Sequence, residues 1–271
     1  MHTEGMQGMD VSDFGGWDPS FTRRAITAAK PIGKRWFRWR VDGLESFPTG
    51  GGALVVSNHS GGIFTADTLI LATALYDRFG YNRPVLTLGH TMLFQGPQGR
   101  WLSRIGLIHA ERSVANNALR SGAVVLVFPG GIYDAYRPTA RADVVDFNGR
   151  TGYVRTAVES RVPIVPVVST GGQQSQLFLT RGTWLAKRLG LTRFRSDILP
   201  ITFGFPFGLS AILPVNMPLP TKIVTQVLAP INVVEQFGDD PDVHEVDAHV
   251  RDMMQTALRD LERQRRWPII G

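Results

Sequence analysis

The chain has 271 residues, of which 43% are hydrophobic and 19% charged, and it contains no cysteine. This length and composition are typical of one globular domain with a sizeable core, and the lack of cysteine excludes disulfides and thiolate chemistry. The 29 Lys and Arg residues outnumber the 23 Asp and Glu residues, and the resulting net charge of +6 favours an anionic partner.

The first forty residues divide into two parts. Residues 1–19 are rich in Gly and Asp and carry no apolar run, so we expect a flexible N-terminus without a signal peptide. Residues 21–40 contain seven basic residues, no acid and several aromatics. Such a basic amphipathic segment suits an anionic membrane surface, where each Lys or Arg contributes roughly 1 kcal/mol. A solvated helix that packs its aromatics inward and single-stranded nucleic-acid binding are the alternatives.

Apolar runs alternate with helical patterns through the middle of the chain. Strands are expected at residues 53–57, 85–88, 123–128, 163–169 and 222–227, and helices at residues 65–78, 92–107, 116–121, 148–161 and 241–266. This alternation predicts an α/β fold with a largely parallel central sheet flanked by helices. Because no linker interrupts the pattern, residues 20–271 are expected to form a single domain.

The longest uncharged stretch, residues 198–221, has the length needed to cross a bilayer. It nevertheless contains five prolines and two glycines, which break a helix and leave backbone groups that hydrocarbon does not satisfy. Strands and loops with an apolar outer face are therefore expected there.

Several familiar catalytic motifs are absent from the sequence. It has no nucleophile elbow, no P-loop and no dinucleotide-binding glycine motif. His244 and His249 are five residues apart and would not share one face of a helix, so no metal site is predicted.

Four short stretches fall at or just after the predicted strand ends, where ligands gather in parallel sheets. The first is Asn58-His59, followed by two glycines and then Asp67. A histidine at this place is suited to act as a general base, although on its own it could equally be a turn residue. The other three stretches are residues 106–112, 127–131 and 162–167.

This order of motifs resembles the glycerolipid acyltransferase superfamily, whose four motifs are Asn-His-x4-Asp, Gly-x-Ile-x-x-x-Arg, Phe-Pro-Glu-Gly and Val-Pro-Ile-x-Pro-Val. The resemblance covers residues 50–170, and the second and fourth motifs are matched in full. Two departures occur. Seven residues rather than four separate His59 from Asp67, and Gly130 stands where the family usually has glutamate. The Phe-Pro-Gly-Gly variant resembles the branch related to neutral-lipid acyltransferases, which weakens the case for glycerol 3-phosphate as acceptor.

The resemblance implies roles for individual residues. His59 would be the general base and Asp67 the carboxylate that orients it, unless Asp67 is only an acid in the first turn of a helix. Arg112 would bind the phosphate of the acceptor, its alternative being a surface salt bridge with a neighbour such as Glu111. The residues that would bind the acceptor are Phe128, Pro129, Gly130, Gly131 and Arg137, where Arg137 would replace a lost polar contact. The residues that would support the acyl site or the backbone are Gly106, Ile108, Pro163 and Pro166.

The sequence thus predicts a membrane-surface O-acyltransferase that moves a fatty acyl group to a hydroxyl of a glycerol-phosphate, a lysophospholipid or a related lipid. Acyl-CoA or acyl-ACP would be the co-substrate, with no cofactor, no metal and no nucleic-acid partner. The expected location is the cytoplasmic face of the cell membrane, as a peripheral or monotopic protein. A non-catalytic lipid-binding protein on the same fold is the alternative.

Overall fold

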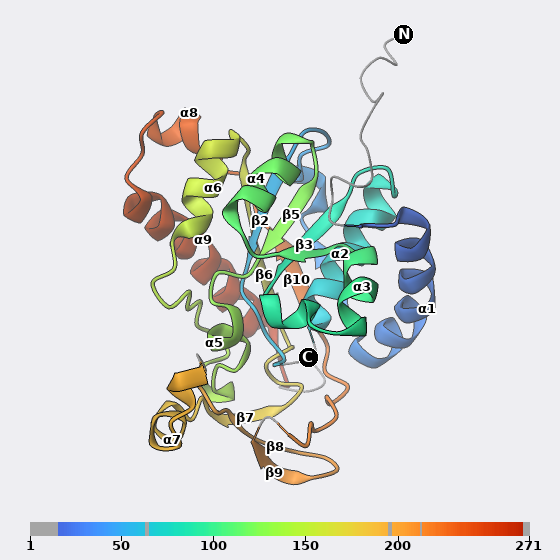
Figure 1. Ribbon diagram of the computed structural model, residues 1–271, viewed down its shortest axis with the longest axis vertical. Coiled ribbons are helices and arrows are strands. Elements are labelled where there is room, and N and C mark those ends of the chain that lie inside the picture. The colour runs from blue at the N-terminus through green and yellow to red at the C-terminus, as the bar shows by residue number, and fades with distance from the viewer. Residues whose placement is uncertain (1–15, 63–64, 195–196, 212, 268–271) are drawn as a thin grey trace.

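A computed structural model describes residues 16–62, 65–194, 197–211 and 213–267 (Figure 1). Most of the predicted flexible N-terminus, residues 1–15, lies outside the described residues. The strands of the described chain are β1 Arg40–Asp42, β2 Ala53–Ser57, β3 Val85–Gly89, β4 Leu107–His109, β5 Val124–Val127, β6 Ile164–Thr170, β7 Leu177–Thr180, β8 Ile201–Gly204, β9 Gly208–Ala211 and β10 Val224–Val227. The α-helices are α1 Pro19–Phe37, α2 Ala66–Phe79, α3 Pro97–Arg104, α4 Arg112–Arg120, α5 Gly131–Ala135, α6 Gly152–Ser160, α7 Thr183–Arg188, α8 Val233–Phe237 and α9 Val243–Gln264. Four 3-10 turns join them, η2 Leu44–Ser46, η3 Thr91–Phe94, η4 Thr139–Arg141 and η5 Leu191–Phe194.

The main sheet has seven strands in the order β1-β10-β6-β2-β5-β3-β4. Every neighbouring pair is parallel except β10 and β6, which run antiparallel. This confirms the predicted α/β class with a mostly parallel central sheet. The carboxyl ends of β2 and β5 lie side by side at one edge, with Val56 paired to Val127, and α5 follows β5 at that edge (Figure 1).

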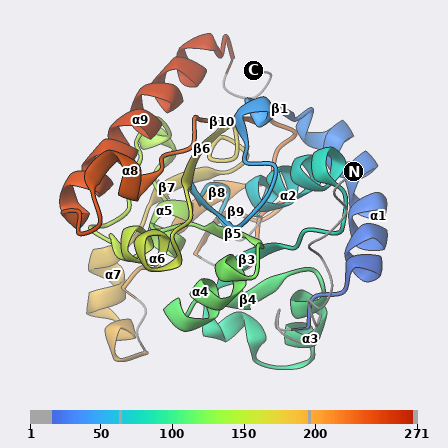
Figure 2. The same cartoon turned by 90° about the horizontal axis from the view of Figure 1, so that it is seen from above.

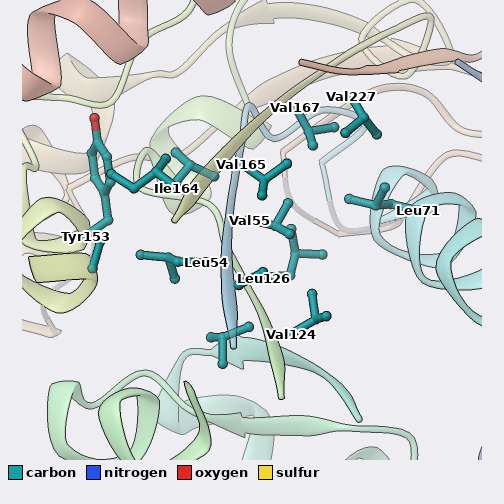
Figure 3. Close-up of a cluster of buried hydrophobic side chains, with 14 of the residues drawn as sticks. Leu54, Val55, Leu71, Val124, Leu126, Tyr153, Ile164, Val165, Val167 and Val227 are labelled. Atoms are coloured by element: carbon teal, nitrogen blue, oxygen red, sulfur yellow. The ribbon is translucent and has the colours of Figure 1, made fainter. Parts of the chain in front are cut away.

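Helices cover both faces of this sheet, with α1 and α2 on one side and α6, α8 and α9 on the other (Figure 2). All five residues of β2 are buried, which explains why this strand reads as an unbroken apolar run rather than an alternating one. Figure 3 shows the resulting core, in which Tyr153 of α6 and Leu71 of α2 lie on opposite sides of Leu54 and Val55.

A second sheet, with strand order β7-β8-β9, is antiparallel and lies below the carboxyl edge of the main sheet in Figure 1. Its strands β8 and β9 come from the uncharged stretch that the sequence predicts to form strands and loops. In the described part of the chain, no helix is both long and apolar enough to pass through a bilayer.

One expectation about the elements is only partly met. The predicted helix at residues 92–107 divides into η3, α3 and the short strand β4. A three-residue strand is too short for its periodicity to be seen, so the sequence pattern missed it. The basic segment at residues 21–40 forms α1, which begins where the Asp18 carboxylate accepts from the Phe21 amide.

Candidate active site

His59 and Asp67 lie next to each other at the carboxyl edge of the main sheet. His59 follows β2, and its Nδ1 is 2.9 Å from Oδ2 of Asp67 in the first turn of α2. The same oxygen accepts a hydrogen bond of 2.9 Å from the Ser60 amide. Gly61 and Gly62 have φ values of +88° and +63°, which glycine adopts without strain and which turn the loop back toward α2. The longer spacing therefore still brings the carboxylate to the ring.

These contacts define the chemical state of the imidazole. With Nδ1–H donated to a carboxylate, Nε2 is the nitrogen that can accept a proton. Burial lowers the pKa of His59, but the charge and hydrogen bond of Asp67 outweigh it, so the pKa lies above the ordinary 6.5. The His59 side chain is 14% exposed and that of Asp67 only 3%, so solvent screens this pair weakly.

Asn58 connects the strand that carries the base to the neighbouring strand β6. Its side chain is fully buried, donates to the Ser169 carbonyl at 3.0 Å and accepts from the Ser169 amide at 2.8 Å. The asparagine of the first motif thus holds the backbone beside His59, a function that sequence reasoning did not assign.

The third motif lies directly against His59. The ring of Phe128 stacks on the imidazole with 4.2 Å between centroids. A guanidinium nitrogen of Arg150 donates to the carbonyls of Pro129 and Gly130, each at 3.2 Å. Gly131 has a φ of +51°, and a Cβ there would lie 3.0 Å from that nitrogen. Arg150 was missed because it lies outside all four motifs, in the loop before α6 that the sequence pattern assigned to a helix.

An apolar cavity of about 460 Å³ begins at His59 and Phe128 and runs between α1, α2 and α3. Its wall combines small and aliphatic side chains from these helices with residues of β3. The lining residues include Ala29, His59, Leu69, Ala72, Trp101 and Phe128.

A second cavity, of about 360 Å³, lies at the third motif and is lined by Arg112, Phe128, Pro129 and Arg150 among others. The Arg112 side chain is 48% exposed and lies 3.6 Å from Glu159, rather than pairing with Glu111. Phe128 is common to the two cavities. The ring of Phe128, which stacks on His59, therefore forms part of the wall of an apolar cavity and of a cavity that two arginines and Glu111 line.

Arg137 does not lie where the sequence prediction puts it. Its side chain is only 1% exposed, forms an ion pair with Asp134 and donates to the Ala142 carbonyl. Asp134 in turn accepts from the His59 amide at 2.6 Å. Arg137 is thus buried behind the His59 loop, and this placement does not agree with direct contact to an acceptor.

The residues predicted to give support take backbone positions. A Cβ at Gly106, whose φ is +97°, would lie 2.6 Å from the Val85 carbonyl, so glycine is needed where β4 begins. Ile108 is buried in β4, and Pro166 is buried in β6 opposite Val56. The carbonyl of Pro163 accepts from the Leu54 amide at 3.0 Å. Among the described residues, no cluster of three His, Asp or Glu side chains is arranged to hold a metal ion.

The chain is similar to several known proteins. The family model described as Acyltransferase matches residues 38–170. An uncharacterized protein of Mycobacterium leprae is 32% identical over 269 residues, which cover 94% of this chain and 69% of the relative. A bovine protein named "DGAT1/2-independent enzyme synthesizing storage lipids" is 26% identical over 195 residues, covering 72% of this chain and 56% of its own length.

The fold is shared with the solved 1-acyl-sn-glycerophosphate acyltransferase PlsC of Thermotoga maritima. The two superpose with a TM-score of 0.55 at 17% identity, over 89% of this chain and 81% of that one. The motif order, the site and these comparisons lead to one conclusion: the chain belongs to the acyltransferase family.

Proposed function

We propose that the chain transfers a fatty acyl group from a thioester, acyl-CoA or acyl-ACP, to a hydroxyl of a lipid acceptor at a membrane surface, with His59 as general base. The observation that carries the proposal is the pairing of His59 Nδ1 with the Asp67 carboxylate beside Phe128, which lines both cavities. In the reaction, Nε2 takes the hydroxyl proton while the alcohol oxygen attacks the thioester carbonyl. The tetrahedral intermediate then collapses, the carbon–sulfur bond breaks, and the thiolate leaves and takes up the proton from His59.

The two cavities suit the two substrates. The apolar cavity along α1, α2 and α3 would hold the acyl chain, because its wall offers aliphatic and aromatic surface. Arg112 and Arg150 line the other cavity and would attract an anionic group on the acceptor.

Two classes of acceptor fit this proposal, phosphate esters and uncharged lipids. The two arginines favour glycerol 3-phosphate, lysophosphatidic acid or another lysophospholipid. The storage-lipid name of the bovine relative favours an uncharged acceptor such as a monoacylglycerol. A panel of these acceptors with labelled acyl-CoA, read by product mass, separates the two classes. If the acceptor is a phosphate ester, Arg112→Gln should raise its KM and leave the KM of an uncharged acceptor unchanged.

The base is tested by replacing His59 with Gln. The variant should lose about 10²- to 10⁴-fold in kcat, the usual contribution of a positioned general base. His244→Gln, an exposed change on α9, serves as the matched control, and thermal unfolding checks that both variants fold. Wild-type turnover in a folded His59→Gln protein would exclude this mechanism. Lipid co-purification without turnover on any acceptor would support the non-catalytic lipid-binding alternative instead.

Contact with the membrane is proposed through the second sheet and the segment after it. Large apolar side chains project from this surface to solvent, and the most exposed are Phe203 at 53%, Phe205 at 71%, Phe207 at 54%, Leu209 at 67%, Leu213 at 72% and Met217 at 53%. Residues 171–222 carry six Lys or Arg and a single acid, Asp197. A bilayer with anionic headgroups complements both properties.

The end of the basic helix α1 adjoins this surface. The indole nitrogen of Trp36 donates to the Pro218 carbonyl at 3.0 Å, and Arg38 donates to the Pro220 carbonyl at 2.7 Å. Phe178 of β7 lies against Gly62 of the His59 loop, where a Cβ would be 3.0 Å from its ring. A bilayer on this surface would therefore lie near the candidate base.

Vesicle co-sedimentation tests the surface. The double change Phe205→Ser with Phe207→Ser should reduce binding to phosphatidylglycerol-containing vesicles at least about tenfold, since two exposed phenyl groups no longer enter the bilayer. Turnover of an acceptor that dissolves as monomers should stay at the wild-type rate. Unchanged vesicle binding by the double variant would place the membrane contact elsewhere.

A further inference from the structure

Gly130 leaves space that the side chain of Asp134 occupies. The φ of Gly130 is −66°, so glycine is not required here for backbone conformation. A Cβ at this position would lie 2.4 Å from the Asp134 Cβ and 2.6 Å from the Asp146 carbonyl oxygen. A glutamate at position 130 and the observed position of Asp134 therefore exclude each other.

Asp134 directs its carboxylate at the candidate base and not at the acceptor cavity. One oxygen, Oδ2, accepts from the backbone amide of His59 at 2.6 Å, and the other pairs with Arg137. The Asp134 side chain is completely buried. Two carboxylates thus hold a single residue, because Asp67 fixes the ring of His59 while Asp134 fixes its main chain.

The Asp134–Arg137 pair is hard to explain by stability alone. Removing two charges from water is costly, and apolar residues of similar volume often serve the fold as well as a buried ion pair. The guanidinium nevertheless gives the carboxylate the counter-charge that it needs to remain a hydrogen-bond acceptor in the interior. Because the carboxylate has two oxygens, one can pair with Arg137 while the other accepts from the backbone amide of His59.

We propose that Asp134 is a positioning residue for His59, and that Gly130 is glycine to make room for it. The family motif has its carboxylate at position 130, whereas in this chain the carboxylate is that of Asp134, four residues later. It acts on the acceptor only indirectly, by holding the base in place. This inference rests on the proposed role of His59. It explains how a Phe-Pro-Gly-Gly motif retains a carboxylate in the site while the acceptor cavity loses one.

The test compares Asp134→Asn with Asp247→Asn. Asp247 is a matched control because it is also buried and paired with an arginine, Arg251 at 2.8 Å, but lies on α9. Asp134→Asn keeps the shape and an acceptor for the His59 amide but removes the charge. We expect its kcat to fall about 10- to 100-fold, with the acceptor KM within about twofold of wild type, because the misplaced group is the base. Asp247→Asn should lose stability and keep its kcat.

A titration provides a readout that does not depend on turnover. The charge of Asp134 helps to raise the pKa of His59, so Asp134→Asn should move the imidazole titration, followed by NMR, to lower pH. The His59 resonance is assigned by its absence in His59→Gln. If Asp134→Asn fails to fold, the double variant with Arg137→Met removes the uncompensated cation and tests whether kcat still falls.

Each outcome decides one claim. A His59 titration and a kcat that are both unchanged in Asp134→Asn would overturn the positioning role. An Asp247→Asn variant with the same losses would show that any buried Asp–Arg pair has this effect, and would also overturn it. A wild-type protein without acyl transfer, but with a His59 titration that depends on Asp134, would refute the proposed function and leave the positioning of His59 intact.

Discussion

Replacing Asp67 with Asn tests the candidate dyad with the smallest change of shape. In the structure, Oδ2 of Asp67 accepts from His59 Nδ1 and from the Ser60 amide, each at 2.9 Å, and Oδ1 accepts from the Thr68 amide at 2.8 Å. An asparagine has only one acceptor atom for these three donors. Its NH₂ group must therefore face either His59 and Ser60 or the Thr68 amide, and a donor meets a donor in both orientations.

The expected loss follows from the hydrogen bond that is weakened. A bond to a charged group contributes about 1.5–3 kcal/mol, and 1.36 kcal/mol of barrier corresponds to tenfold in rate. Asp67→Asn should therefore lower kcat about 10- to 150-fold if the amide oxygen faces the ring. If the NH₂ group faces the ring, the proton is held on Nε2 instead, and the loss should approach the roughly 10⁴-fold known for the corresponding change in a serine protease.

The pH dependence gives the sign of the electrostatic effect. A general base works in its neutral form, so wild-type kcat/KM should fall as the pH drops through the pKa of His59, which lies above 6.5. In Asp67→Asn the burial of the ring still lowers this pKa, and the main opposing charge is gone. The acidic limb should therefore move to lower pH while the maximum rate drops.

The assay is transfer of labelled acyl groups from acyl-CoA, measured between about pH 5 and 9, around the ordinary pKa of histidine. Asp77→Asn is the control, since Asp77 also lies on α2 but is 49% exposed and pairs with Lys30 at the surface. The reasoning is refuted if Asp67→Asn keeps both the wild-type kcat and the wild-type acidic limb.

Three further outcomes can be measured. Gly130→Ala should lower the free energy of unfolding by about 1–3 kcal/mol in thermal melts, because its Cβ would overlap Asp134 and the Asp146 carbonyl. Gly152→Ala is the control, since no atom lies within 4 Å of a Cβ there, and it should cost nothing. Equal losses in the two variants would contradict the steric argument. Ala72→Trp should fill part of the apolar cavity and reduce kcat/KM for long-chain acyl-CoA more than for short-chain acyl-CoA, and an unaltered chain-length profile would place the acyl chain elsewhere. Asn58→Ala should destabilise the fold by about 1–3 kcal/mol for each of the two Ser169 backbone groups that lose their partner, and a melting temperature equal to wild type would show that water replaces them.

The strands of the main sheet were predictable where burial is complete. Residues 53–57 and 164–170 are buried along their whole length and therefore read as apolar runs with sharp ends. Local pattern does not contain the order of strands, and the antiparallel pairing of β10 with β6 depends on contacts between segments more than fifty residues apart. The individual strands of the second sheet were hard to locate from the sequence, since each has only four residues and they lie among prolines and glycines.

In the site, it was easier to predict which residues take part than which side chains contact each other. The pairing of His59 with Asp67 depends on two glycines with positive φ, and counting residues from a shorter family pattern cannot supply that geometry. Arg137 was misplaced because proximity to a motif says nothing about burial. Its spacing of three residues from Asp134 was the available signal, because side chains at i and i+3 meet on one face of a helical turn.

Phe128 lies between the two cavities of the site and lines both of them. Its ring stacks on His59 and belongs to the walls of both cavities, so under the proposed function it would stand between an acyl chain on one side and an anionic headgroup on the other. The apolar cavity disfavours a charged group, and the arginines of the second cavity favour one, so the proposed substrates would each be sorted by their own chemistry. Under the proposed function, the two reacting groups, a thioester carbonyl and a hydroxyl, would meet beside this ring. A base held there by two carboxylates would therefore meet the hydroxyl where the acyl carbon is also present.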